Sequence, residues 1–169
     1  LSKASETVRK SEIGKRTREF IRNDQLQPSD RFKPIKCFDV NMNKFDWNSV
    51  KGKKFTIIVG GLWCMTHGMD NSLPKQYFES IKENYGDSHQ LILYVYCNDS
   101  EEMKAEIKEF GLEDYTVISD FKGRATPFTS IYNCQATPTC IYIDAEGIIV
   151  NIMEGLDPNY LENEFILKQ

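Results

Sequence analysis

One cysteine in this sequence stands where a reactive thiol is easily made. Cys64 follows the apolar run Phe55–Val59 and a Gly-Gly pair, and it precedes a stretch with helical spacing. A cysteine in the first turn of a helix faces unpaired backbone N–H groups and the positive end of the helix dipole, which together stabilise the thiolate. His67 lies three residues further on, where it can add a hydrogen-bond donor or a positive charge to the same turn. We therefore expect Cys64 to be an activated nucleophile beside His67.

A second candidate element is Thr137 followed by Pro138, at the start of the strand expected over 139–144. Proline cannot donate to a strand ladder, so a proline at the start of a strand marks a turn. A cis bond between these two residues would bring the backbone polar groups of Thr137 to the surface, where they can pair with an extended peptide.

The elements that must position these residues follow from the hydrophobic pattern. Short apolar runs bounded by turn signals alternate with helical patterns, which predicts an α/β sheet with helices on both faces. Residues 1–30 are expected to be a helical or flexible extension, and residues 31–169 one domain. A β-hairpin is expected within 32–50, and His89 is expected to be solvated in a polar turn. Strands are expected at 55–59, 90–97, 115–118, 139–144 and 148–153, and helices at 68–85, 100–110, 125–132 and 159–167.

Composition excludes several classes of function. The 169 residues are 40% hydrophobic and 27% charged, as in an ordinary soluble domain, and the net charge of -4 argues against a nucleic-acid partner. No apolar run is long enough to span a bilayer. The chain begins with Leu and shows no signal peptide, which is compatible with the removal of an export signal and does not indicate a cytosolic location.

Two motifs in order resemble a known family. The stretch 32–64, FKPIKCFDVNMNKFDWNSVKGKKFTIIVGGLWC, resembles the beginning of TlpA/ResA-like thiol–disulfide oxidoreductases, where a hairpin and a KGK turn lead to a buried strand ending in Trp-Cys-x-x-Cys. Downstream, YNCQATPTCIYIDAEGIIV is similar to the family's Tyr-x-Val-x-x-Thr-Pro-Thr segment and Ile-Asp-x-x-Gly hairpin. The resemblance implies a thioredoxin-like fold of the AhpC/TSA–redoxin superfamily: a central mixed sheet flanked by helices, with an N-terminal β-hairpin.

The resemblance also implies roles for single residues. Cys64 takes the place of the attacking cysteine, Trp63 that of the aromatic residue before it, and Pro138 that of the cis-proline facing the thiol. Thr137 takes the place of the residue whose backbone contacts the substrate. His67 stands where the family has its resolving cysteine, so ordinary dithiol chemistry does not carry over.

The missing second cysteine shapes the expected chemistry. A Cys64 thiolate can form a mixed disulfide, but its release then needs another thiol. Cys97 and Cys134 are candidate resolving residues, and both can equally be small core residues. Cys37 and Cys140 are most simply structural.

The implied function is thiol–disulfide exchange with protein or small-molecule thiols and disulfides, without a cofactor, in the bacterial cell envelope or periplasm. One alternative is a non-catalytic binding module that keeps the fold and the Pro138 surface. A weaker alternative is Cu(I) binding at Cys64 and His67, although only one cysteine is present there. A peroxiredoxin-type peroxidase is disfavoured, because His67 occupies the position of its reactive cysteine.

Overall fold

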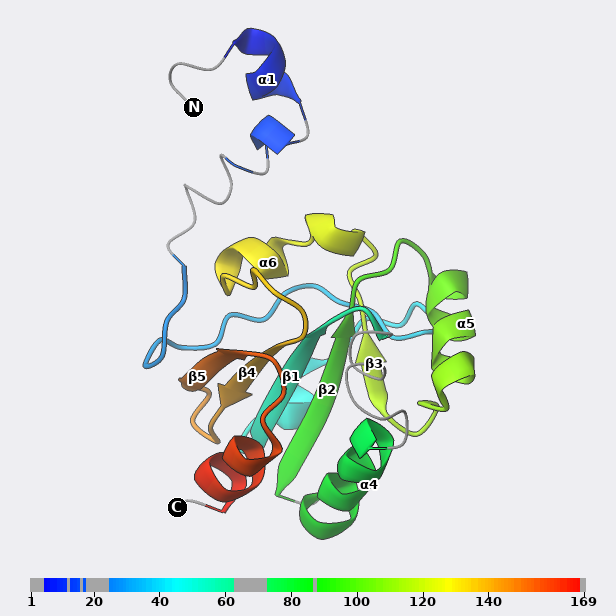
Figure 1. Cartoon of the computed structure of the whole chain (residues 1–169), viewed down its shortest axis with the longest axis vertical. Coiled ribbons are helices and arrows are strands. Elements are labelled where there is room, and N and C mark those ends of the chain that lie inside the picture. Colours follow the sequence, from blue (N-terminus) through cyan, green and yellow to red (C-terminus); the bar gives the residue numbers. More distant parts are fainter. Residues whose placement is uncertain are drawn as a thin grey trace.

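A mixed sheet forms the centre of the molecule. The computed structural model describes residues 5–11, 13–15, 17, 25–62, 73–86 and 88–167, the side chains of residues 73–77 excepted. The described residues form a five-stranded sheet in the order β3-β2-β1-β4-β5 (Figure 1). The three strands β1, β2 and β3 run parallel, whereas β4 is antiparallel to both β1 and β5. The strands are β1 (Lys54–Gly60), β2 (His89–Val95), β3 (Thr116–Ile118), β4 (Thr139–Ile143) and β5 (Ile149–Glu154).

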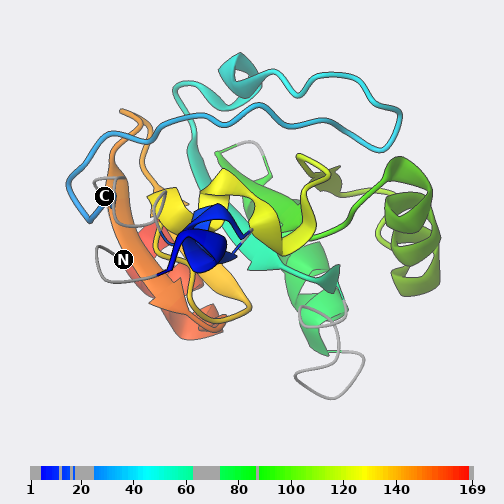
Figure 2. The ribbon, with the colours of Figure 1, turned by 90° about the horizontal axis from the view of Figure 1, so that it is seen from above.

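Helices and an irregular segment cover the two faces of this sheet (Figure 2). One face packs against α4 (Leu73–Tyr85), α5 (Ser100–Phe110) and the π-helical turns η3 (Tyr160–Ile166). The other face packs against the segment 25–50 and α6 (Pro127–Ile131). The remaining described helices are α1 (Glu6–Lys10), which buries no residue, and the 3-10 turns η1 (Trp47–Val50) and η2 (Gly123–Ala125). None of the described helices is long and apolar enough to cross a membrane.

Strand β1 forms because its sequence suits burial on both sides. Its run of β-branched residues favours extended backbone, and Ile57, Ile58 and Val59 are each at most 1% exposed. Side chains alternate along a strand, so Ile58 enters the core under α4 and α5 while Ile57 and Val59 enter the core under α6. A strand of this kind belongs in the middle of a sheet that is covered on both faces, and β1 lies between the parallel β2 and the antiparallel β4.

Local signals also set the helix that follows β2. The Asp99 carboxylate accepts hydrogen bonds from the amides of Glu101 and Glu102 at 3.0 and 2.8 Å, which caps the first turn of α5. Gly111 ends the helix at φ 63°, a left-handed conformation that glycine adopts without strain. The chain then enters β3, the edge strand expected from the sequence.

The expected N-terminal hairpin is reduced to a reversal with a single bridge. Phe38 pairs with Lys44, and the turn between them is closed by the Asp39 carboxylate, which accepts the amides of Asn41 and Asn43. On its other side Phe38 pairs with Ser119, which ties the segment to the edge of the sheet. The division between an extension and a domain near residue 30 stays a prediction.

The segment 25–50 is fixed to the sheet by side chains. The hydroxyl of Tyr132 accepts the amide of Lys33 at 3.0 Å and donates to its carbonyl at 2.8 Å. Leu26 is 5% exposed, and its amide donates to the carbonyl of Ile131. The described part of the segment is therefore integral to the core under α6.

His89 corrects one expectation, because it is buried rather than solvated. It begins β2 opposite Lys54, is 2% exposed, and packs edge-on against Phe165 at 5.6 Å between ring centroids. Its Nε2 lies 3.3 Å from the Thr56 hydroxyl. Burial, followed by the charge of Lys54, lowers its pKa to about 3. The polar residues next to His89 in the sequence suggested an exposed turn, but η3 covers its side chain in the folded protein.

We predict that His89 makes the fold sensitive to acid. Below pH 6.5 the unfolded chain binds a proton at this histidine while the folded chain does not until about pH 3. Stability is therefore lost as pH falls through this window, by at most about 1.4 kcal/mol per pH unit from this residue. Urea unfolding at several pH values measures the loss, and His89→Phe should remove this part of the slope while Thr56→Val keeps it. Equal slopes in wild type and His89→Phe would contradict the assignment.

Candidate functional site

The candidate site lies at the edge where the parallel strands end. Gly60 is paired with Val95 across β1 and β2, and its carbonyl accepts the amide of Tyr96 at 2.9 Å. On the other side, Val59 at the end of β1 pairs with Thr139 at the start of β4. The end of β1 and the start of β4 therefore lie side by side. In open parallel sheets, ligands and reactive groups gather at this end of the strands.

The turn into β4 has the geometry expected from the sequence. The bond between Thr137 and Pro138 is cis. The Thr139 hydroxyl donates to the carbonyl of Ala136 at 2.7 Å, and the amide of Gly155 donates to the carbonyl of Pro138 at 2.7 Å. One hydrogen bond within the turn and one from the residue after β5 therefore fix its conformation. Continued by two residues, the antiparallel register brings residues 60 and 61 alongside Pro138 and Thr137.

The residues that carry the expected chemistry fall beyond this point. Trp63, Cys64 and His67 lie outside the described residues, so their roles stay predictions. The last described residue before them is Leu62, which is fully buried.

The two candidate resolving cysteines are both buried. Cys97 follows β2 at the same edge of the sheet and is 0% exposed, and burial raises the pKa of its thiol to about 11. Cys134 is 8% exposed, and burial raises its pKa to about 12. A thiol with a pKa of about 11 is ionised in roughly one molecule in ten thousand at neutral pH. Either residue would have to be uncovered before it could resolve a mixed disulfide.

All four described cysteines are buried free thiols on two separate faces of the sheet. Cys97 and Cys140 belong to the core under α4 and α5, while Cys37 and Cys134 belong to the core under α6. Burial raises the pKa of both Cys37 and Cys140 to about 12, and the Cys37 thiol donates to the carbonyl of Ile35 at 3.3 Å. These environments suit inert structural thiols.

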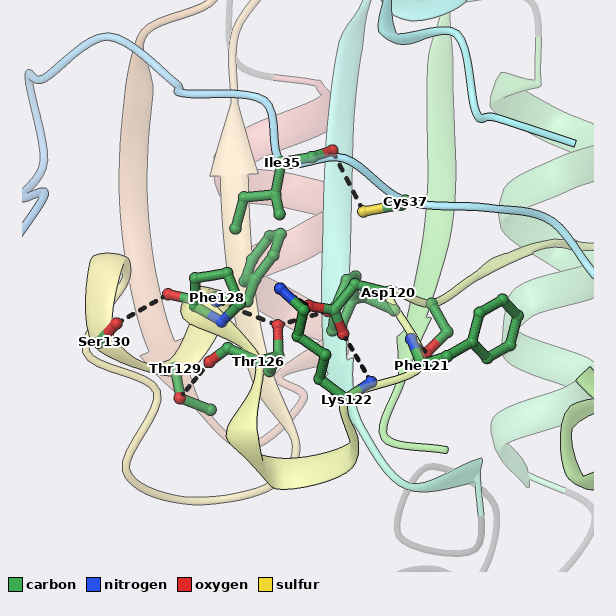
Figure 3. A network of polar contacts seen from close by, with 12 residues as sticks. Ile35, Cys37, Asp120, Phe121, Lys122, Thr126, Phe128, Thr129 and Ser130 are labelled. Carbon is green, nitrogen blue, oxygen red and sulfur yellow. Dashed lines mark hydrogen bonds and ion pairs between the residues drawn. The ribbon is translucent and has the colours of Figure 1, made fainter. Parts of the chain in front are cut away.

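A buried polar network at the same edge was missed by the sequence reading (Figure 3). The hydroxyls of Tyr94 and Thr126 lie 2.5 Å apart, and Thr126 also accepts the amide of Phe128 at 3.2 Å. The Asp120 side chain is only 4% exposed; its Oδ1 accepts the amide of Lys122, whose Nζ lies 3.9 Å from Oδ2. Burial first, and the Asp120 charge after it, raise the pKa of Tyr94 and keep the phenol protonated.

This network places a carboxylate beside the sheet edge without exposing it to solvent. Asp120 follows β3, as Tyr96 follows β2 and residue 61 follows β1, so the three positions share one edge. The available sequence signal was a carboxylate two residues after a predicted strand. Its partner Tyr94 was assigned to packing, and the contact between strand and helix start could not be read from spacing.

Comparison with known proteins identifies the fold of this chain. No protein-family model matches the sequence, and no curated protein matches it significantly. Solved structures do match. A thiol-disulfide isomerase from Corynebacterium glutamicum is 19% identical, with a TM-score of 0.66 over 83% of this chain and 98% of that one. The chain has a thioredoxin-like fold.

Two further structures have the same fold, at a similar level of sequence identity. A thiol-disulfide oxidoreductase from Bacteroides fragilis is 15% identical, with a TM-score of 0.58 over 76% of this chain and 92% of that one. The exposed lipoprotein thioredoxin of Streptococcus pneumoniae is 19% identical, with a TM-score of 0.60 over 75% of this chain and 93% of that one. The mixed sheet flanked by helices is therefore as the sequence predicted.

We predict that the described cysteines react slowly in the folded protein. Burial and raised pKa values protect Cys37, Cys97, Cys134 and Cys140 from a thiol reagent at pH 8. Reaction with 5,5′-dithiobis(2-nitrobenzoate) should show at most one fast thiol before denaturation and all five after it. Cys64→Ser should abolish the fast phase. A second fast thiol in the native protein would show that one of the four is accessible.

We predict that Thr126 stabilises the fold through its hydroxyl. Thr126→Val removes the partner of the buried Tyr94 hydroxyl and the cap of α6, and should lower the free energy of unfolding by about 1–2 kcal/mol. Thr126→Ser keeps both hydrogen bonds and should lose less. Urea titration followed by circular dichroism measures both variants, and a loss in Thr126→Ser as large as that in Thr126→Val or larger would contradict a dominant role of the hydroxyl.

Proposed function

We propose that this protein performs thiol–disulfide exchange with Cys64 as its single attacking thiolate. The observation that supports the proposal best is the register of β1 against β4. Because Val59 pairs with Thr139, the chain leaves β1 alongside Thr137 and Pro138, and Cys64 follows only three residues after position 61. A client chain lying on the Thr137 turn would then be within reach of the thiol.

The structural neighbours support the same chemistry. The neighbour from Corynebacterium glutamicum is a thiol-disulfide isomerase, and the neighbour from Bacteroides fragilis is a thiol-disulfide oxidoreductase. We propose that this chain is a TlpA/ResA-like relative in which His67 replaces the second cysteine. Its clients would be protein or small-molecule disulfides.

The proposed reaction has two steps. The Cys64 thiolate attacks one sulfur of a client disulfide, so that a mixed disulfide forms and the client's other sulfur leaves as a thiolate. A second thiolate then attacks the client sulfur of the mixed disulfide. That step joins the second thiol to the client and releases Cys64 as a thiolate, so the protein undergoes no net oxidation.

The second thiol is proposed to come from outside the folded chain. Cys97 and Cys134 are the nearest candidates by position, yet both are buried and protonated at neutral pH. The client's own thiol, or a small thiol such as glutathione, needs no such rearrangement. Isomerisation of a client disulfide fits this scheme without an added reductant.

A second candidate is a binding module that keeps the Pro138 surface without chemistry. It is favoured by the absence of a second cysteine from the Cys-x-x-His motif and by the burial of all four described thiols. For either function we propose a location in the cell envelope. The pneumococcal neighbour, which is an exposed lipoprotein, supports that proposal.

We predict that Cys64 has a pKa below the 8.5 of an ordinary thiol. The rate of alkylation by iodoacetamide as a function of pH measures it, and His67→Ala should raise it. Oxidised glutathione should form a mixed disulfide with the protein, detectable by mass spectrometry, and reduced glutathione should release it. Cys64→Ser is the control for both measurements.

The two candidate functions separate in this experiment. A pKa near 8.5 with no mixed disulfide, in a protein that is folded by circular dichroism, would reject exchange chemistry and favour the binding module. A low pKa with a mixed disulfide that glutathione does not release would reject turnover by an external thiol.

A further inference from the structure

The outer edge of β3 has no strand partner over part of its length, and Val117 in that part is 5% exposed. Ser119 exchanges both main-chain hydrogen bonds with Phe38, at 2.8 and 3.0 Å, on the side away from β2. Alternate residues of a strand direct their N–H and C=O groups to the same side, so those of Val117 also face outward. Among the described residues, no strand partner pairs with Val117 on that side, because the segment 25–50 turns away at Asp39.

A cavity of about 560 Å³ lies along this edge. Its floor is β3, one wall is α5, and the other wall is the turn 39–45, which reaches toward α5 in both views of the ribbon (Figures 1 and 2). The lining is mostly apolar, and its main apolar contributors are Val40, Phe45, Ile107, Leu112 and Val117. The volume lies in the range of sites that bind small ligands or a few side chains.

Two lysines on α5 stand at the rim of this cavity. Lys104 and Lys108 are one helical turn apart and both are exposed. Lys104 contacts Glu101 at 2.8 Å, but an exposed pair of this kind is weak and exchanges easily. Two acids also line the cavity. The Asp39 carboxylate is occupied by hydrogen bonds within its own turn, and Glu113 follows α5. The charged side chains that line the cavity are thus two lysines and two carboxylates, and the two lysines are the ones that α5 itself contributes.

We propose that this groove binds an extended polypeptide segment that adds a strand to β3 and carries an acidic side chain toward α5. The segment runs antiparallel to β3, continuing the line of residue 38, and exchanges main-chain hydrogen bonds with Val117. Its residue opposite Val117 points to the α5 side, because Val117 and Ile107 share one core. An apolar residue at that position fills the cavity, and a carboxylate two residues away, on the same face, meets Lys104 or Lys108.

The shape of the site favours a single peptide over a second copy of this chain. A cavity between two walls is concave, whereas the pairing of two β3 edges needs a surface that is complementary to itself. A small amphipathic anion would use the apolar lining and the lysines but leave the Val117 main chain unpaired. The peptide uses all three features. This site is separate from Cys64, so its failure would leave the proposed exchange chemistry untouched.

The test uses the full chain and a symmetric peptide without cysteine, acetyl-Glu-Thr-Val-Thr-Glu-amide. Titration into the ¹⁵N-labelled protein, followed by amide chemical shifts, should move the signals of Val117, Leu112 and their neighbours. The same peptide with N-methylvaline at its centre cannot exchange both hydrogen bonds and should not bind. The peptide with Gln in place of Glu should bind more weakly.

Protein variants test the charge. The pair Lys104→Gln and Lys108→Gln together should weaken binding of the glutamate peptide about five-fold and leave binding of the glutamine peptide unchanged. The matched control is Lys51→Gln with Lys53→Gln, which removes the same charge from an exposed turn away from the cavity. The control should bind as the wild type does.

Each of the following results would overturn the proposal. No shift at millimolar peptide, or shifts confined to another surface, would mean that the groove does not bind an extended segment. Equal binding of the N-methyl peptide would identify an apolar pocket for anions in place of strand addition. Shifts at β3 that depend on protein concentration alone would identify a second copy as the occupant.

Discussion

The pairing of β1 with both of its neighbours is the constraint on which the rest of the molecule depends. β1 is hydrogen-bonded to β2 on one side and to β4 on the other, and its apolar residues are divided between two cores. A shift of the strand register by one residue would move Ile57 and Ile58 to the opposite faces of the sheet, and neither core would then be packed correctly. The same register decides which residues stand opposite Pro138. The packing of the two cores therefore also fixes the positions of the backbone residues at the candidate site.

The parts of this arrangement that the sequence predicted are those encoded by contiguous residues. The strands β1, β2 and β4 are continuous apolar runs, and α5 is bounded by Asp99 at its start and Gly111 at its end. The turn at Thr137 and Pro138 was equally local, because a proline before a strand leaves few alternatives. Each of these signals is contained within a few neighbouring residues, so no knowledge of the rest of the fold was needed.

The parts that were missed depend on residues distant in the sequence. His89 is buried because Phe165 packs over it, and nothing in the residues around His89 indicates that contact. The buried Asp120 interacts with Tyr94, and Tyr94 is hydrogen-bonded to Thr126, so the network joins a strand and a helix start that meet only in the folded chain. The N-terminal hairpin was overestimated as well, since its one bridge is Phe38 with Lys44, and Phe38 is joined to the sheet through the distant Ser119. Local pattern specifies elements, and long-range contact decides how their polar residues are used.

The distribution of the thiols over the two faces of the sheet bears on how the chain matures. An unfolded chain exposes all five cysteines to whatever oxidant surrounds it, and any two of them can then couple. Once the sheet has formed, Cys97 and Cys140 lie in the core on one face of the sheet, and Cys37 and Cys134 lie in the core on the other face. The order of events therefore matters more than the final redox environment. A chain that folds before it is oxidised keeps these four thiols buried, whereas an early disulfide between thiols of opposite faces would have to break before the sheet could form.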